Sequence, residues 1–242
     1  MTQAGYVFVY GMVTAVATSL GVLPFIFVKK ISPRVIAASN AVASGLMLGA
    51  CFGMVAEGAE LGTWQTGIGG LLGVGFILLT QRLLAHSDVG FGDVRGAGAR
   101  KMILIVVVMT VHSIAEGVAI GASFAGGVTL ATLITVAIAV HNVPEGLAIT
   151  AVLRPQGVGL GKCAWWSFFS SLPQPLVAVP AFFFVDAFAP SLPYGLGFAA
   201  GAMVFMVLVE LLPEAYEEGQ RGTVGLLVSL SLIAMVAFQR ML

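Results

Sequence analysis

Long apolar stretches, separated by short segments that carry charges, prolines or glycines, run through the whole chain. A helix needs about 20 mostly apolar residues to cross a bilayer, and eight stretches reach about that length. The connections between them leave no room for an extramembrane domain. The pattern therefore predicts one all-α, polytopic integral membrane domain over residues 1–242. We expect its transmembrane helices at residues 5–28, 34–55, 64–84, 102–124, 128–153, 163–184, 194–215 and 223–238.

The composition supports a membrane protein and excludes several other classes. Apolar residues make up 59% of the chain and charged residues 9%, whereas a soluble domain carries about 25% charged residues. The apolar content excludes a soluble enzyme and a disordered protein. A nucleic-acid binder is also excluded, since 11 basic and 11 acidic residues leave no basic patch. We expect Cys51 and Cys163 to be small buried side chains. We also expect residues 5–28 to be a retained span and not a signal peptide.

The basic residues predict the orientation in the membrane, because Lys and Arg near span ends stay on the cytoplasmic side. Ten of the 11 fall between spans one and two, three and four, five and six, or seven and eight. We therefore expect both termini outside the cytoplasm, in a plasma or inner membrane. The longest connection, residues 86–101, is rich in glycine, and we expect it to be flexible. The ten residues are Lys29, Lys30, Arg34, Arg82, Arg95, Arg100, Lys101, Arg154, Lys162 and Arg221.

Four ionisable residues fall near the middle of predicted spans. Each costs roughly 2.5 to 3.5 kcal/mol to insert unless it has a partner or faces water. His112 and Glu116 lie four residues apart in the fourth span, and His141 and Glu145 repeat this spacing in the fifth, so each pair shares a helix face. The surrounding segments, 111–120 and 140–149, are identical at six of ten positions. Because the two spans run in opposite directions, they resemble the inverted elements of transporter sites.

Two imidazoles and two carboxylates that face one another make four metal ligands. This mixture suits zinc, iron(II), manganese or cobalt and disfavours copper(I). Pro144 frees a backbone carbonyl beside the predicted site, and we expect Gly117 and Gly146 to let the fourth and fifth helices approach closely. The alternative is that the histidines only pack or donate hydrogen bonds and that the glutamates are protonated.

At these residues the sequence resembles the ZIP (Zrt/Irt-like) family of divalent metal transporters. Residues 141–146 match the family's His-x-x-Pro-Glu-Gly motif, and residues 112–117 match its fourth-span motif except that Ser113 and Ala115 replace an asparagine and a proline. The resemblance implies that spans one to three and six to eight are related by inversion around spans four and five. It also implies a homodimer and transport of metal into the cytoplasm.

The family's central site can hold a second metal, and the resemblance places the corresponding positions at Ser113, Asn142 and Gln174, which precedes Pro175. These residues carry no negative charge. We therefore expect a single metal bound by the two histidines and two glutamates. Met47 resembles a position that lends a thioether ligand in some relatives, and the alternative is an ordinary core methionine.

Acidic residues near the span ends are candidates for the ends of a metal pathway. Glu57 and Glu60 lie at the outer end of the second span, where they attract cations or simply cap a solvated helix. Glu210 and Glu214 lie near the inner end of the seventh span and resemble a family motif at the cytoplasmic exit, with Glu210 the stronger candidate for lining the pathway. The long loop adds a weaker metal-sensing candidate, made of His86, Asp88 and Asp93.

Together these features predict a transporter of divalent metal ions, zinc first, with iron, manganese or cadmium as further candidates. We expect no enzyme activity, no resident cofactor and no nucleic-acid partner; the partners are the metal, the lipid bilayer and a second copy of the chain. One alternative is a membrane metalloenzyme of the di-metal carboxylate type, although its usual Glu-x-x-His spacing is absent. Another is a metal sensor without transport activity, against which the complete set of four ligands argues.

Overall fold

The computed structural model describes residues 2–27, 32–85, 90–92, 94–124, 127–184 and 189–241. The side chains of Leu84, Ala85, Leu130, His141 and Ala189 are outside this description, although their backbone is included. Several residues singled out in the sequence therefore lie outside the described part. These are Lys29, Lys30, His86, Asp88 and Asp93.

The chain is almost entirely helical, as predicted. The first half contains α1 (Gln3–Ser19), the 3-10 turn η1 (Leu20–Val22), α2 (Leu23–Ile26), α3 (Pro33–Ala85), β1 (Gly90–Phe91), β2 (Val94–Arg95) and α4 (Gly96–Ser123). The second half contains α5 (Val128–Leu153), η3 (Arg154–Gln156), α6 (Leu160–Ser170), α7 (Pro173–Phe183), η4 (Ala189–Ser191), α9 (Leu192–Met206), η5 (Val207–Leu211), α10 (Leu212–Glu218) and α11 (Arg221–Met241). Strands β1 and β2 form a small antiparallel hairpin that pairs Gly90 with Arg95.

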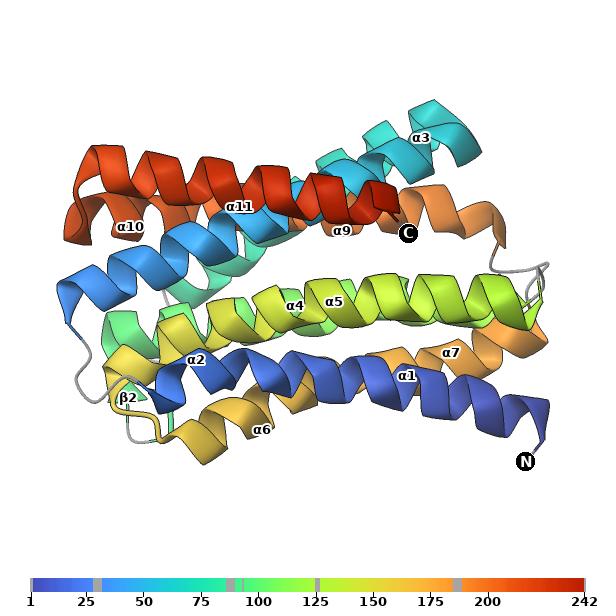
Figure 1. The fold of residues 1–242 in the computed structure, drawn as a ribbon, viewed down its shortest axis with the longest axis horizontal. Coiled ribbons are helices and arrows are strands. Elements are labelled where there is room, and N and C mark those ends of the chain that lie inside the picture. The colour runs from blue at the N-terminus through green and yellow to red at the C-terminus, as the bar shows by residue number, and fades with distance from the viewer. Residues whose placement is uncertain are drawn as a thin grey trace.

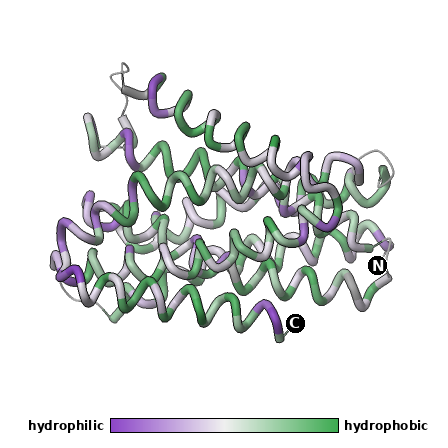
Figure 2. The backbone as a smooth tube through the Cα atoms, turned by 90° about the horizontal axis from the view of Figure 1, so that it is seen from above, coloured by the Kyte–Doolittle hydropathy of each residue, from purple (hydrophilic) through white to green (hydrophobic). Residues whose placement is uncertain are grey.

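The helices pack in two groups, which Figure 1 shows as an upper and a lower layer. In the upper group, α3 packs most extensively against α9 and α11 and also against α10. In the lower group, α4 packs against α7 and α5, and α1 packs against α5, α6 and α7. Contacts of α3 with α5 and of α4 with α9 join the groups. Hydrophobic residues make up most of each helix, as the green colouring of the backbone in Figure 2 shows.

Within the described residues, six helical stretches are long and apolar enough to cross a bilayer. They run over Gln3–Ile26, Pro33–Leu83, Gly96–Ser123, Ala131–Gln156, Leu192–Glu218 and Arg221–Met241. Large apolar side chains such as Leu71 and Ile233 are exposed on their outer faces. An all-α integral membrane protein accounts for this exposure, because lipid replaces water around those faces.

Two predicted spans differ from the structure in their extent or continuity. The second and third predicted spans correspond to the two helical segments of α3, which meet at a kink at Gly62, where φ is 175° and ψ is 101°. The first helical segment extends beyond the predicted end at residue 55 and includes Glu57 and Glu60. Conversely, the predicted span 163–184 is interrupted between α6 and α7, because Pro173 and Pro175 lack the N–H groups that would continue the first helix.

The prediction of a flexible loop over residues 86–101 was wrong for its last part. Helix α4 begins at Gly96, and Arg95 before it has extended backbone angles, φ −128° and ψ 163°. Residues 96–101 are polar enough to fall outside the apolar stretch, but Ala97 and Ala99 favour helix strongly. Hydropathy marks the part of a helix that lies in lipid and not the point where the helix begins.

Glycines allow the closest helix contacts of the upper group. A Cβ atom on Gly197 would lie 2.1 Å from the carbonyl oxygen of Thr66, and one on Gly201 would lie 2.2 Å from that of Gly70. This four-residue spacing lets the backbones of α9 and α3 touch, which is a common way to join helices in a membrane. Cys51 and Cys163 are buried free thiols, as predicted.

Candidate metal centre

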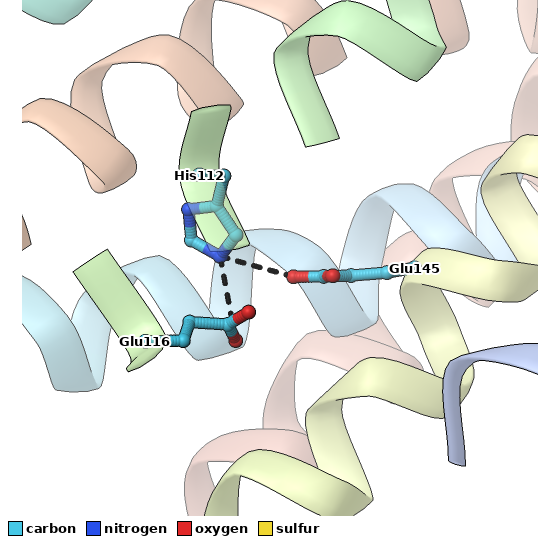
Figure 3. A group of neighbouring side chains, drawn as sticks. All are labelled: His112, Glu116 and Glu145. Carbon is cyan, nitrogen blue, oxygen red and sulfur yellow. Dashed lines mark ion pairs between the residues drawn. The ribbon is translucent and has the colours of Figure 1, made fainter. Parts of the chain in front are cut away.

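A cluster of three buried side chains lies between α4 and α5. His112 and Glu116 come from α4 and Glu145 comes from α5, and Figure 3 shows the two carboxylates turned toward the same imidazole nitrogen. His112 Nε2 lies 3.1 Å from Glu145 Oε1 and 3.6 Å from Glu116 Oε1. All three residues are at most 4% exposed. Such a concentration of ionisable groups away from solvent is stable only when the groups are paired or bind a cation.

The spacing of these atoms fits a zinc ion. One ligand atom from each residue can be chosen so that all lie within 4.8 Å of one another. Two ligands of a tetrahedral zinc at about 2.0 to 2.1 Å are separated by roughly 3.3 Å. The two measured separations, 3.1 and 3.6 Å, lie on either side of that value. The separations between His112 and the two carboxylates are therefore compatible with a tetrahedral metal ion.

A chain of amide hydrogen bonds holds Glu116 from the side of α7. Gln174 Nε2 donates to Glu116 Oε2, and Asn142 Nδ2 donates both to Gln174 Oε1, at 3.1 Å, and to the backbone oxygen of Thr14, at 2.9 Å. Gln174 and Asn142 are fully buried. This chain joins α1, α5, α7 and α4 and fixes the orientation of one metal-facing carboxylate.

The predicted role of two glycines was wrong. Gly117 and Gly146 do not bring α4 and α5 together. A Cβ atom on Gly117 would lie 2.8 Å from the backbone oxygen of Gln174, and one on Gly146 would lie 1.7 Å from the backbone oxygen of Thr18. Each glycine therefore faces a helix other than α4 and α5. The faces of α4 and α5 that meet carry the histidine and glutamates instead. Gly117 allows α7 to pack closely against α4, and Gly146 allows α1 to pack closely against α5.

The remaining predicted site residues have different surroundings. The backbone of His141 lies in α5 one turn before Glu145, but its side chain is outside the described part. Ser113 is fully buried, and its Oγ has no hydrogen-bond partner among the described residues. Met47 is 1% exposed and lies in the main apolar core with Cys51 and Met109. Its thioether role stays a prediction.

A cavity of about 410 Å³ leads to Glu116. Its polar wall includes Glu57 and Glu60 from α3 and Gln239 and Arg240 from α11. Apolar residues of α4, α5 and α9 complete the lining, so the cavity lies between the two helix groups. The cavity provides water-sized space between the acids near the bend of α3 and one carboxylate of the cluster. The predicted entrance acids and a predicted ligand thus border the same space.

The second pair of predicted acids lies far along the bundle, near the start of α4. Glu210 Oε1 accepts a hydrogen bond of 3.1 Å from Gln81 Nε2. Glu214 Oε2 lies 2.7 Å from Lys101 Nζ and accepts a hydrogen bond of 2.6 Å from Asn40 Nδ2. Neither Asn40 nor Lys101 stood out in the sequence as part of a site. The one sequence signal that could have identified Asn40 is the presence of an asparagine within an apolar span.

Comparisons with known proteins agree with the motif. Residues 85–238 match the family described as ZIP zinc transporter. The chain is 43% identical over 232 residues to a candidate zinc transporter of Arabidopsis thaliana, covering 94% of this chain but 37% of that protein. It is 33% identical over 249 residues to the zinc transporter ZIPB of Bordetella bronchiseptica, covering 96% of this chain and 80% of that protein. It is 29% identical over 236 residues to the zinc transporter GufA of Myxococcus xanthus, covering 90% of this chain and 92% of that protein.

Proposed function

The chain belongs to the ZIP zinc transporter family, and from this premise we propose that it carries divalent metal ions, zinc first, across a membrane. The observation that carries the proposal is the buried cluster of His112, Glu116 and Glu145, whose ligand atoms lie within 4.8 Å of one another. A cavity of about 410 Å³ reaches one of these carboxylates. A closed structural zinc site needs no such access, whereas a transport site does.

The proposed transport site holds one metal through His112, Glu116, His141 and Glu145. The position of His141 one turn before Glu145 supports this set, because residues four apart share a helix face. Iron, manganese and cadmium are further candidate cargoes, since nitrogen and oxygen ligands alone do not separate them from zinc. The metal is the substrate here, and the proposal includes no resident cofactor and no catalysed reaction.

A second metal beside the first is not part of the proposal. Gln174 turns an N–H donor toward Glu116, and Asn142 in turn donates to Gln174. A cation in that position would meet amide hydrogens where it requires oxygen lone pairs. Asn142 and Gln174 therefore act in the proposal as neutral neighbours that orient a ligand, and Ser113 is a neutral buried neighbour without that role.

We propose that the chain crosses the membrane eight times. Two features support a count higher than the six long apolar stretches. Helix α3 has 53 residues and bends at Gly62, which is enough for two crossings of about 20 residues each. Helices α6 and α7 have 11 residues each and follow one another directly, so together they supply one further crossing. Spans one to three and six to eight would then be the two halves of an inverted repeat.

Metal would enter from the side of the cavity and leave into the cytoplasm. The distribution of basic residues places the connection before α4 on the cytoplasmic side and the bend of α3 outside. Glu57 and Glu60, which lie just before the bend, line the cavity. Both termini would lie outside a plasma or inner membrane. The family resemblance also supports a homodimer, for which the exposed apolar residues of α11 offer a surface.

Uptake by proteoliposomes tests the function directly. The purified full chain is reconstituted, and entry of radiolabelled zinc is followed with unlabelled iron, manganese or cadmium as competitors. Replacement of Glu145 by glutamine should reduce zinc uptake by at least about 100-fold, because removing even a supporting neighbour of a ligand commonly costs 10- to 100-fold. The matched control is Glu217→Gln, which removes an exposed acid. Full uptake by the Glu145 variant would refute the site.

A further inference from the structure

One ion pair connects the two helix groups near the start of α4, away from the cavity. Lys101 lies on α4 of the lower group, and its Nζ lies 2.7 Å from Oε2 of Glu214 on α10 of the upper group. Asn40 on α3 donates to the same oxygen at 2.6 Å and is itself fully buried. The Lys101 and Glu214 side chains are 22% and 27% exposed. The pair is therefore partly shielded from water and held in one geometry by a buried amide.

A small void lies in the protein interior beside this pair. A void of about 10 Å³ lies among Lys101, Leu104, Glu210 and neighbouring apolar residues, which is at the limit of what one water molecule needs. The cavity near Glu57 is about 410 Å³. Along α4, Lys101 precedes His112 by 11 residues, or roughly 16 Å. A large cavity thus borders the cluster on one side, whereas the void about three turns away along α4 is small.

The helix that carries the acids has an irregular turn at this point. Residues Val207–Leu211 form a π-helix, in which the Leu212 N–H donates to the Val207 oxygen five residues earlier. Pro213 follows and has no N–H to donate. Glu210 lies within the widened turn and Glu214 directly after it. Turns of this kind are often found at functional sites, because a small change of hydrogen bonding shifts the helix register.

We propose that Lys101, Glu214 and Asn40 form a latch that keeps the inner end of the metal pathway closed while the cavity is open. The Lys101 ammonium occupies Glu214 as a tethered cation. Metal ions that leave the cluster toward this end can pass only after Lys101 and Glu214 separate, and the separation moves α4 away from α10. The inference rests on the proposed transport function but concerns only the closure of this end.

The latch explains why a lysine is placed beside acids on a pathway for cations. A permanent positive charge beside Glu210 and Glu214 repels a metal ion approaching from either side. When Lys101 moves away with α4, the carboxylate of Glu214 becomes available to attract the leaving cation. The same pair therefore closes the end in one state and favours exit in the other.

Thiol modification tests the latch without requiring transport. A cysteine is introduced by Leu104→Cys, at a side chain that is 4% exposed and lines the void. The purified full chain is treated with N-ethylmaleimide. This reagent is uncharged, so removing the charge of Lys101 does not attract it or repel it. The parent protein, whose Cys51 and Cys163 are buried, is the blank. Mass spectrometry then gives the modification rate.

Lys101→Met and Glu214→Gln should each raise the modification rate of the introduced cysteine about two- to fivefold, the range that one partly exposed ion pair provides. Lys101→Arg should leave the rate low. The exchange Lys101→Glu with Glu214→Lys should restore the low rate, since Asn40 can then accept from the new lysine through its amide oxygen. An unchanged rate in Lys101→Met, or an exchange variant as fast as the single variants, would overturn the latch.

Equilibrium zinc binding to each variant shows whether the fold is intact, because the cluster lies roughly 16 Å from Lys101 along α4. Binding should be unchanged within about twofold. Absence of zinc uptake by the parent protein would contradict the proposed function but not the latch. Modification rates that do not change in the variants would contradict the latch but not the proposed function.

Discussion

Gln174 donates its side-chain amide to Glu116, so one oxygen of a metal-facing carboxylate is already engaged by a neutral neighbour. The other oxygen of Glu116 lies 3.6 Å from His112. A carboxylate held in this way offers a single oxygen to a metal, which favours monodentate, four-coordinate binding. Glutamine at position 174 thus orients a candidate ligand, and we predict that it also limits the number of metals.

Gln174→Glu should allow a second metal to bind. The change replaces an N–H donor by a carboxylate beside Glu116, and two adjacent carboxylates attract a second cation strongly. We expect the zinc-to-protein ratio to rise from about one toward about two, because the new carboxylate and Glu116 can both bind a second ion, and water can complete its coordination. Isothermal titration with purified protein measures this ratio.

Gln220→Glu is the matched control for that experiment, since it makes the same chemical change at an exposed residue. If Gln174→Glu and Gln220→Glu both leave the ratio unchanged, position 174 has no part in setting the number of metals.

Gly146→Ala should destabilise the protein. The added Cβ would lie 1.7 Å from the Thr18 oxygen, so α1 must move away from α5, and overpacking of this kind costs about 1–3 kcal/mol. Gly75→Ala is the control, because it lies within α3 with no atom within 4 Å of the added Cβ. A lower Tm in detergent for Gly146→Ala but not for Gly75→Ala is expected, and equal Tm values would disprove the tight contact.

The helical class and the pairing of two motifs could be predicted from the sequence, because apolar length and a four-residue spacing are local properties. Glu116 had to share a face with His112 on any regular helix. That Glu145 reaches the same imidazole depended on the motif repeat, which two matching segments made visible. Both inferences needed only residues close together in the chain or nearly identical segments.

Contacts between distant helices could not be predicted in this way. Lys101 and Glu214 are separated by more than a hundred residues, and neither residue type is unusual near the end of a membrane helix. The partners of Gly117 and Gly146 were assigned to the wrong helices because a glycine indicates close approach without naming its neighbour. The predicted break between spans 34–55 and 64–84 contains the kink at Gly62, but its form was hidden, since hydropathy does not distinguish a loop from a bent helix.

His141→Gln should weaken zinc binding as much as His112→Gln does. Both residues precede a glutamate by one turn, and a four-coordinate site loses one of its two nitrogen ligands in either variant. Each change should raise the zinc Kd by at least about 100-fold, more than the loss of a supporting residue causes. Competition with a zinc-sensitive dye gives the Kd. A His141 variant that binds zinc normally would reduce the site to the three residues of the described cluster.

Neutralising the cavity acids should slow metal capture without altering the later steps. Glu57 and Glu60 line the cavity together with Glu116, and negative charge in such a space raises the local concentration of cations. Glu57→Gln with Glu60→Gln should therefore raise the KM for zinc about three- to tenfold at low ionic strength and leave kcat unchanged. The difference from the parent protein should shrink as salt is added, because the Debye length falls from about 30 Å at 0.01 M to about 8 Å at 0.15 M. Glu217→Gln, which removes an exposed acid, serves as the control and should show no such salt dependence. Uptake rates measured over a range of zinc and salt concentrations separate the two constants. A lower kcat with an unchanged KM would assign these acids to a step after capture and contradict their role at the entrance.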